Sequence, residues 1–191
     1  MNQVFVIMGV SGCGKSTVGL ALAQRLGAMF YDGDDFHPPE NVAKMAGGTP
    51  LNDDDRYPWL ARLHDLIAEH LARGETAVLA CSALKKKYRD QLRQGNDGVR
   101  LVYLQGSLNL IWERMAARQT HYMKPAMLQS QFDALEPPSA QNTMIISVEH
   151  SVEDIVGRII REFGLDSQAE GASELDENVQ DRNGDPPRHR I

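Results

Sequence analysis

Residues 9–16 read Gly-Val-Ser-Gly-Cys-Gly-Lys-Ser, a complete G-x-x-x-x-G-K-[ST] pattern. An apolar run at residues 4–8 precedes the pattern and predicts a buried strand, and residues 17–26 follow with the apolar spacing of a helix. A strand, a glycine-rich loop and a helix form the context that a phosphate-binding loop requires. The sequence therefore predicts an α/β fold with this loop between its first strand and first helix.

The chemistry of this loop follows from its glycines, which let consecutive backbone N–H groups point inward at phosphate oxygens. The start of the helix adds a partial positive charge. Lys15 is expected to reach the β- and γ-phosphates, and the Ser16 hydroxyl to bind Mg²⁺. The expected nucleotide-binding residues of the loop are Gly9, Val10, Ser11, Gly12, Cys13, Gly14, Lys15, Ser16 and Thr17. The loop alone fits kinases, GTPases and ATPase motors equally well.

Length and charge narrow these classes. A chain of 191 residues predicts one domain, which suits a small-molecule kinase better than a motor with accessory domains. The net charge of −6 argues against a nucleic-acid partner. The two cysteines predict reduced thiols and therefore a cytoplasmic protein. The strand expected at residues 4–8 leaves no room for a signal peptide. No apolar stretch approaches the length needed to span a membrane, so no membrane partner is expected.

The last 26 residues differ from the rest in composition. Residues 166–191 carry seven acidic and three basic residues and almost no large apolar ones. Such a segment cannot bury enough apolar surface to offset the entropy of ordering. We therefore expect residues 1–165 to form the folded domain and residues 166–191 a disordered acidic tail.

Strand and helix patterns alternate along the expected domain. Further strands are predicted at residues 29–31, 77–81, 101–104 and 143–148, and further helices at residues 38–45, 59–71, 84–92, 108–118, 126–135 and 152–163. Residues 49–58 are expected to be a polar connection. Five short apolar strands that alternate with helices predict a parallel sheet covered by helices on both faces.

An acidic segment, Asp32-Gly-Asp34-Asp35, directly follows the second predicted strand. Ligand sites in open parallel sheets lie beyond the carboxyl ends of the strands, so this segment is expected to face the phosphate loop. Its carboxylates could hold Mg²⁺, accept a proton or bind substrate hydroxyls; alternatively, they cap the next helix. The third strand ends in Cys81-Ser82 and not in an aspartate, so the metal is expected on Ser16 and Asp32.

Two basic regions are further candidates. Arg114 and Arg118 are four residues apart on one helix face, and with His121 they predict a lid that closes over the phosphates at about residues 118–126. Residues 34–59 contain His37, Lys44 and Arg56, a set suited to a carboxylate with several hydroxyls. The alternative for residues 34–59 is a solvated connection. A further basic cluster lies at residues 82–89, in which we favour solvated surface charge for Lys86 and Lys87.

Five strings resemble those of gluconokinases, and together they span about residues 4–163. They are residues 8–16, residues 32–38 (DGDDFHP), residues 50–60 (PLNDDDRYPWL), residues 81–90 (CSALKKKYRD) and residues 128–137 (LQSQFDALEP). The resemblance implies transfer of the ATP γ-phosphoryl group to the terminal hydroxyl of D-gluconate, giving 6-phosphogluconate and ADP. It also implies an adenylate-kinase-like P-loop fold with sheet order 2-3-1-4-5, a substrate-binding segment at about residues 34–59, a lid and a homodimer.

Residue roles follow from the same resemblance. Asp34 would orient, or deprotonate, the acceptor hydroxyl, and Lys15 and Arg118 would brace the phosphates beside Arg114. Gluconate would be bound by His37, Lys44, Arg56, Lys85 and His121. Two departures are Cys13, where serine is frequent, and the acidic tail. Rival hypotheses are a shikimate or nucleoside monophosphate kinase, or a non-catalytic nucleotide switch, although the chain has no guanine-specifying N-K-x-D string.

Overall fold

The computed structural model describes residues 2–117 and 125–165. Its strands are β1 (Val4–Met8), β2 (Met29–Asp32), β3 (Ala77–Ala80), β4 (Val99–Gln105) and β5 (Thr143–Ser147). They form one parallel sheet in the order β2-β3-β1-β4-β5, which confirms the expected order. The expected lid (mainly residues 118–124, with Arg118 and His121) and the acidic tail lie outside the described residues.

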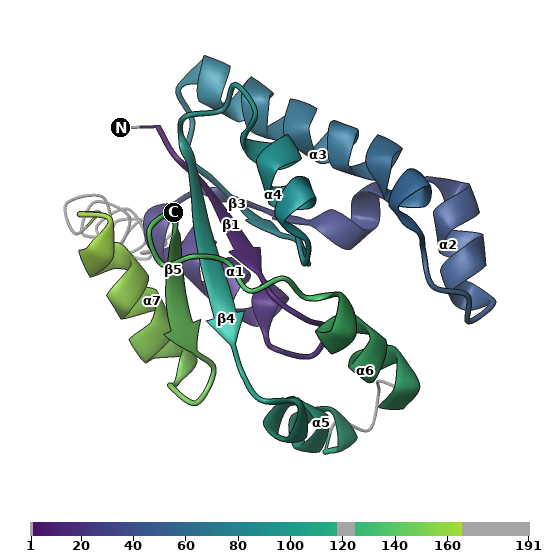
Figure 1. The fold of residues 1–191 in the computed structure, drawn as a ribbon. Coiled ribbons are helices and arrows are strands. Elements are labelled where there is room, and N and C mark those ends of the chain that lie inside the picture. The colour runs from purple at the N-terminus through teal and green to yellow at the C-terminus, as the bar shows by residue number, and fades with distance from the viewer. Residues whose placement is uncertain (1, 118–124, 166–191) are drawn as a thin grey trace, which may run out of the picture.

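Helices lie on both sides of this sheet, as expected (Figure 1). They are α1 (Lys15–Leu26), α2 (Pro39–Ala46), α3 (Asp53–Arg73), α4 (Lys86–Arg93), α5 (Leu108–Ala116), α6 (Pro125–Ala134) and α7 (Val152–Glu162). A 3-10 turn, η1 (Gly33–Phe36), directly follows β2. None of the helices within the described ranges combines the length and the apolar character needed to cross a bilayer.

Alternation along β1 divides the core into two parts. Phe5 and Ile7 point to one face of the sheet, where α1 and α7 pack, and Val4 and Val6 point to the other, where α3 and α4 pack. All four side chains are at most 2% exposed. Burial on both faces explains why β1 is continuously apolar, and it fixes the end of the strand from which the phosphate loop emerges.

The start of α3 differs from the sequence-based expectation. Residues 49–58 were expected to be a polar connection, but the helix begins at Asp53 and includes Pro58. Asn52 accepts a hydrogen bond from the Asp55 backbone N–H, and the Asp55 side chain accepts one from the Asn52 N–H. This capping box, with three aspartates in the first turn, stabilises a helix start that apolar periodicity does not reveal.

The loop between β3 and α4 also departs from expectation. The helix expected at residues 84–92 begins at Lys86, because Lys85 is an extended N-cap. Ala83 has a φ of 41°, a left-handed conformation that is unusual for a residue other than glycine. The Arg89 guanidinium is buried and donates to the Ala83 and Leu84 carbonyl oxygens, which holds this turn in place.

Candidate active site

The phosphate loop lies between β1 and α1, packed against β4 and α5. A Cβ on Gly9 would lie 2.9 Å from the Leu104 carbonyl oxygen, and a Cβ on Gly12 would lie 2.4 Å from the Met115 sulfur. Both glycines have positive φ, at 145° and 82°. The loop therefore needs glycine at these positions both for its backbone conformation and for its close packing.

Polar groups of the loop have partners within the protein. The Lys15 ammonium donates to the Val10 carbonyl oxygen at 3.0 Å, and the Ser11 N–H donates to the Gln131 side-chain oxygen at 2.7 Å. The Ser16 hydroxyl donates to Asp32 Oδ2 at 2.7 Å. The loop and the acidic end of β2 therefore face each other, as the sequence predicts.

Asp32 shows that the capping and the functional interpretations of the acidic segment are compatible. Its Oδ1 accepts a hydrogen bond from the Asp34 N–H at 3.1 Å and caps η1. Its Oδ2 accepts from the Ser16 hydroxyl, so two hard oxygen donors lie beside the phosphate loop, which fits Mg²⁺. Within the described residues, no group of three or more His, Cys, Asp or Glu side chains could hold a metal alone. A magnesium ion here would need phosphate oxygens and water as further ligands.

Asp34 projects from a tightly held segment. Its side chain is 81% exposed, whereas the preceding Gly33 is buried so closely that a Cβ would lie 2.6 Å from the Ala80 carbonyl oxygen. The Trp59 indole N–H donates to the Gly33 carbonyl oxygen at 2.7 Å. This arrangement presents an exposed carboxylate on a fixed backbone at the carboxyl edge of the sheet.

His37 lies behind Asp34 and is buried, with 5% of its side chain exposed. Its ring stacks on Trp59 with centroids 4.3 Å apart, and its Nε2 lies 3.9 Å from Asp34 Oδ1. Burial lowers the pKa of His37, which outweighs the opposing effect of Asp34. Its Nδ1 is buried without a hydrogen-bond partner among the described residues. The other nitrogen, Nε2, lies toward Asp34, so it is the atom of this neutral imidazole that is suited to a hydroxyl ligand.

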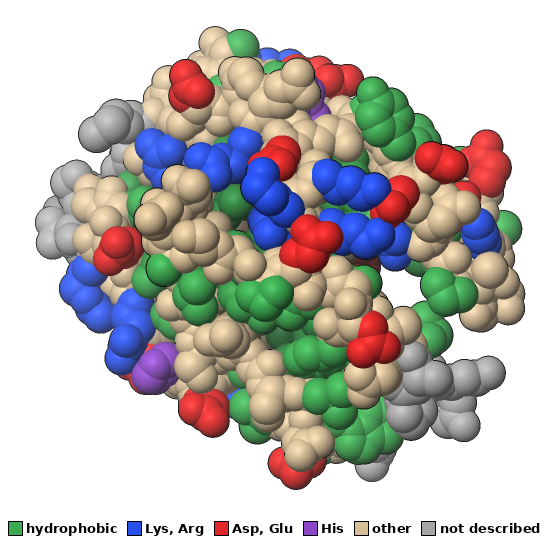
Figure 2. Space-filling model, in the orientation of Figure 1, with side chains coloured by type: hydrophobic (Ala, Val, Ile, Leu, Met, Phe, Trp, Pro, Cys, Tyr) green, Lys and Arg blue, Asp and Glu red, His purple; other side chains and the backbone are tan. Residues whose placement is uncertain are grey.

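The candidate cations of the acceptor site gather around the start of α3. Lys44 forms an ion pair with Asp55 at 2.5 Å, and Lys85 forms one with Asp53 at 2.8 Å. Arg56 donates to the Leu51 carbonyl oxygen at 2.6 Å and lies over the Tyr88 ring. Figure 2 shows this interleaving of basic and acidic side chains across α4 toward the start of α3.

Asp53 is the centre of this cluster, and sequence reasoning gave it no role. Besides Lys85, it accepts from Lys87 at 2.6 Å and from the Tyr88 hydroxyl. The hydrogen bonds from Lys85, Lys87 and Tyr88 hold the pKa of Asp53 well below its usual range. Lys87 is 58% exposed, as expected for a surface charge, but its ammonium also pairs with Asp53. Lys86 is 73% exposed and pairs with Asp90, four residues along α4.

The structure describes one of the three remaining candidate residues. Arg114 is half-buried on α5, the helix whose Met115 packs against Gly12 of the phosphate loop. Arg118 and His121 lie outside the described residues. Gln131 and Tyr88 were missed as site residues; each belongs to a string that carries the family resemblance, but only the fold shows what they contact.

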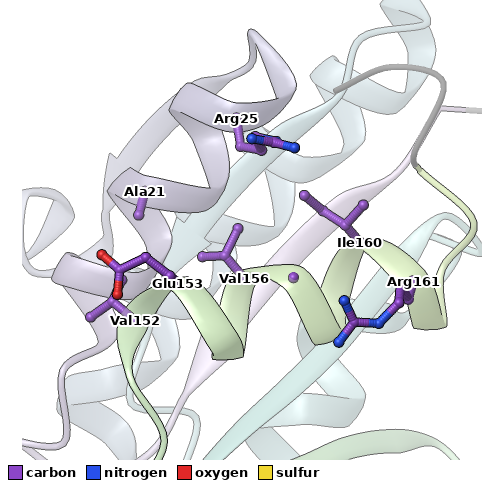
Figure 3. A pocket seen from close by; sticks show the side chains of 8 residues that line it. Ala21, Arg25, Val152, Glu153, Val156, Ile160 and Arg161 are labelled. Carbon is purple, nitrogen blue, oxygen red and sulfur yellow. The ribbon is translucent and has the colours of Figure 1, made fainter. Parts of the chain in front are cut away.

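A separate cavity of about 340 Å³ lies between α1 and α7 (Figure 3). Ala21 and Arg25 line it from the second half of α1, and Val156 and Ile160 line it from α7. The phosphate loop runs into the first turn of α1, whereas Ala21 and Arg25 lie in the second half of that helix, so this cavity is not the candidate nucleotide site.

Comparison with known proteins gives the chain relatives along nearly its whole domain. The family model for shikimate kinase matches residues 11–163. The chain is 47% identical over 176 residues to a probable gluconokinase from Rattus norvegicus, covering 82% of this chain and 95% of that protein. It is 43% identical over 161 residues to the thermoresistant gluconokinase of Escherichia coli K12, covering 83% and 92%. A crystal structure of a gluconokinase from Sinorhizobium meliloti 1021 superposes with a TM-score of 0.73 at 41% identity, covering 95% of this chain and 98% of that one.

Proposed function

The chain belongs to the gluconokinase family, and we propose that it transfers the γ-phosphoryl group of ATP to the terminal hydroxyl of D-gluconate. The products are 6-phospho-D-gluconate and ADP. The observation that carries this function is the match to gluconokinases over nearly their full length. The strings that resemble those of gluconokinases form both the phosphate loop and the acidic segment. The contact between Ser16 and Asp32 supports it, because donor and acceptor groups must meet at one edge of the sheet.

On the nucleotide side, we assign the phosphates to the loop of residues 9–17 and to Lys15. Lys15 is a point charge whose present partner is a neutral carbonyl oxygen, so exchange for phosphate oxygens is favourable. Arg114, on the helix that packs against the loop, and Arg118 would add charge to the same phosphates. Bound at Ser16 and Asp32, Mg²⁺ would neutralise charge on the β- and γ-phosphate oxygens.

On the acceptor side, we assign the reacting hydroxyl to Asp34. The hydroxyl oxygen bonds to the γ-phosphorus while the bond from that phosphorus to the β,γ-bridging oxygen breaks, and the hydroxyl proton passes to Asp34. The exposed carboxylate on a backbone fixed by Trp59 is suited to orient this hydroxyl. The neutral His37 would bind a neighbouring hydroxyl.

The gluconate carboxylate needs a cation, and we assign it to the group of Lys44, Arg56 and Lys85. Each of these cations is already held in place, Lys44 and Lys85 by aspartates of α3 and Arg56 by the Leu51 carbonyl oxygen. Pre-positioned charges lose less side-chain entropy when they bind a carboxylate. His121 would complete the acceptor site. Most of the rate gain would then come from positioning and charge stabilisation.

We also propose that the enzyme acts in the cytoplasm as a homodimer. Both cysteines are buried free thiols, which agrees with a reducing compartment. The dimer rests on the family resemblance alone.

The test is an ADP-release assay with Mg·ATP against D-gluconate, shikimate, glycerate and nucleoside monophosphates. We expect turnover with gluconate, and we expect Lys15→Ala to reduce it by more than about a hundredfold with the fold retained. Asp34→Asn should abolish turnover while ADP still binds. Turnover with shikimate in place of gluconate would support the kinase activity and contradict the assignment of gluconate as the acceptor. Tight ATP binding without turnover of any acceptor would favour the non-catalytic nucleotide switch.

A further inference from the structure

The backbone N–H of Ser11 is already occupied in this structure. It donates to the side-chain oxygen of Gln131 at 2.7 Å, across 120 positions of sequence. Ser11 lies within the phosphate loop, whose N–H groups bind phosphate oxygens when a nucleotide is present. One N–H has one hydrogen to donate, so a phosphate oxygen that binds Ser11 has to replace the carboxamide.

Packing on α6 fixes the position of Gln131. Leu128, one turn earlier on the same helix, is 1% exposed and belongs to the core cluster that contains Val10 and Cys13. Phe132 packs against the same cluster. The carboxamide is therefore directed at the loop by a packed helix, which distinguishes it from a long surface side chain that happens to lie nearby.

A second anchor follows the end of α6. The Glu136 N–H donates to the Leu84 carbonyl oxygen at 3.0 Å, and the Glu136 carboxylate accepts from the Lys86 N–H at 2.6 Å. Both partners lie at the junction that carries Lys85. The segment from Gln131 to Glu136 therefore joins the phosphate loop to the β3–α4 loop. The packing of α6 and the hydrogen bonds of Glu136 together fix the position of Gln131.

From this geometry we propose that Gln131 is a positioning residue that takes the place of a phosphate oxygen at the Ser11 N–H until nucleotide binds. The inference rests on the proposed function, in that it takes the loop to be the nucleotide site. The contact between Lys15 and the Val10 carbonyl oxygen is a second internal substitute in the same loop. Nucleotide binding then exchanges internal hydrogen bonds for bonds to phosphate, and the lost contact with Gln131 reduces the measured affinity.

This exchange predicts whether each of two substitutions strengthens or weakens ADP binding. Gln131→Ala removes the competing acceptor, so ADP should bind about threefold more tightly, the scale of one net hydrogen bond. Gln131→Glu places a carboxylate that accepts more strongly and repels phosphate, so ADP should bind at least about tenfold more weakly. The matched control is Gln129→Ala on the same helix, because Gln129 is exposed and its side chain donates to Asp133; it should leave the affinity unchanged.

Calorimetric titration of the full-length protein with ADP and with pyrophosphate measures these affinities without turnover. Both ligands should show the same ratio between variant and wild type, because the effect acts on phosphate and not on the base. The Ser11 amide resonance should differ between wild type and Gln131→Ala without ligand and coincide with ADP bound. Unchanged ADP affinity in Gln131→Ala, or a loss of tenfold, would overturn the proposal, the latter because Gln131 would then be a nucleotide ligand. Failure of wild type to bind ADP at all would instead contradict the proposed function.

Discussion

The indole N–H of Trp59 donates a 2.7 Å hydrogen bond to the carbonyl oxygen of Gly33, one residue before Asp34. The face of the same ring stacks on His37, three residues after Asp34. Trp59 is 1% exposed and lies in the second core cluster, so a core residue contacts the backbone before the candidate catalytic carboxylate and a side chain after it. Trp59 is therefore both a core residue and a residue that positions the site.

Trp59→Phe tests this role because phenylalanine keeps an aromatic ring against His37 and loses the hydrogen bond to Gly33. We expect kcat to fall about tenfold, the scale of a buried hydrogen bond whose acceptor is left unpaired, with little change in the KM for ATP. Steady-state kinetics separate the two parameters. Trp112→Phe is the control, because Trp112 lies on α5 and packs against the other core cluster. An equal loss of kcat in both variants would show that general destabilisation, and not positioning, is responsible.

The parts of the site that could be predicted from the sequence are those whose residues are contiguous in the chain. The loop of residues 9–16, the buried strand before it and the acidic segment after β2 are each contiguous, so local pattern locates them. Contacts between distant residues were not predictable in the same way. Gln131 and Ser11 are 120 positions apart, and Lys85 and Asp53 are 32 apart, and nothing in either local pattern specifies the partner.

Two local features could have been predicted and were not. Asn52 and Asp55 have the three-residue spacing of a capping box, but the polar composition of residues 49–58 and Pro58 suggested a connection without a helix. Ala83 has positive φ without being glycine, and only Arg89, buried five or six residues further on, explains how the turn is held. The capping box is a local signal that was overlooked, whereas the backbone of Ala83 departs from its local propensity because Arg89 holds the turn.

Asp53→Asn should affect the acceptor and not the nucleotide. The amide no longer neutralises Lys85 and Lys87 and accepts more weakly from Tyr88, so the cations around the acceptor site lose their fixed arrangement. We expect the KM for gluconate to rise about five- to tenfold, the scale of one charge-assisted hydrogen bond, with the KM for ATP within about twofold. Asp54→Asn is the matched control, since Asp54 is exposed and next in sequence. A rise in both KM values would show that Asp53 supports the folding of the whole site and does not act specifically on the acceptor cations.

The pH dependence of stability should carry opposite contributions from two histidines. Burial lowers the pKa of His37, so the unfolded chain takes up a proton at His37 first as the pH falls. The contribution of His37 is therefore present above its unfolded pKa of about 6.5 and is lost below it. His64 donates to the Gln94 carbonyl oxygen and lies beside Asp65, which raises its pKa. Its contribution is present below about 6.5 and is lost as the pH rises through the folded value.

Urea unfolding of wild type, His37→Gln and His64→Gln between about pH 5.5 and 8 measures both contributions. The free energy of unfolding of wild type minus that of His37→Gln should increase with pH across this range. The same difference for His64→Gln should decrease. Comparing slopes removes any constant packing effect of the substitutions. Parallel slopes for the two variants would contradict the assigned environments.

Thiol reactivity tests the packing of the loop and of the strand beside it. Cys13 is 3% exposed and Cys81 is 1% exposed. Burial raises the pKa of the Cys81 thiol to about 12 and also raises that of Cys13, despite the nearby Lys15. Because the thiolate is the reactive form, an aromatic disulfide reagent at about pH 8 should modify neither cysteine in the native protein and both in urea. Cys13→Ser, a replacement that keeps the loop backbone free to bind phosphate, should leave one thiol reactive after unfolding. Rapid modification of one thiol in native wild type, absent from Cys13→Ser, would show that the phosphate loop opens away from Leu104 and Met115 far more readily than its packing implies.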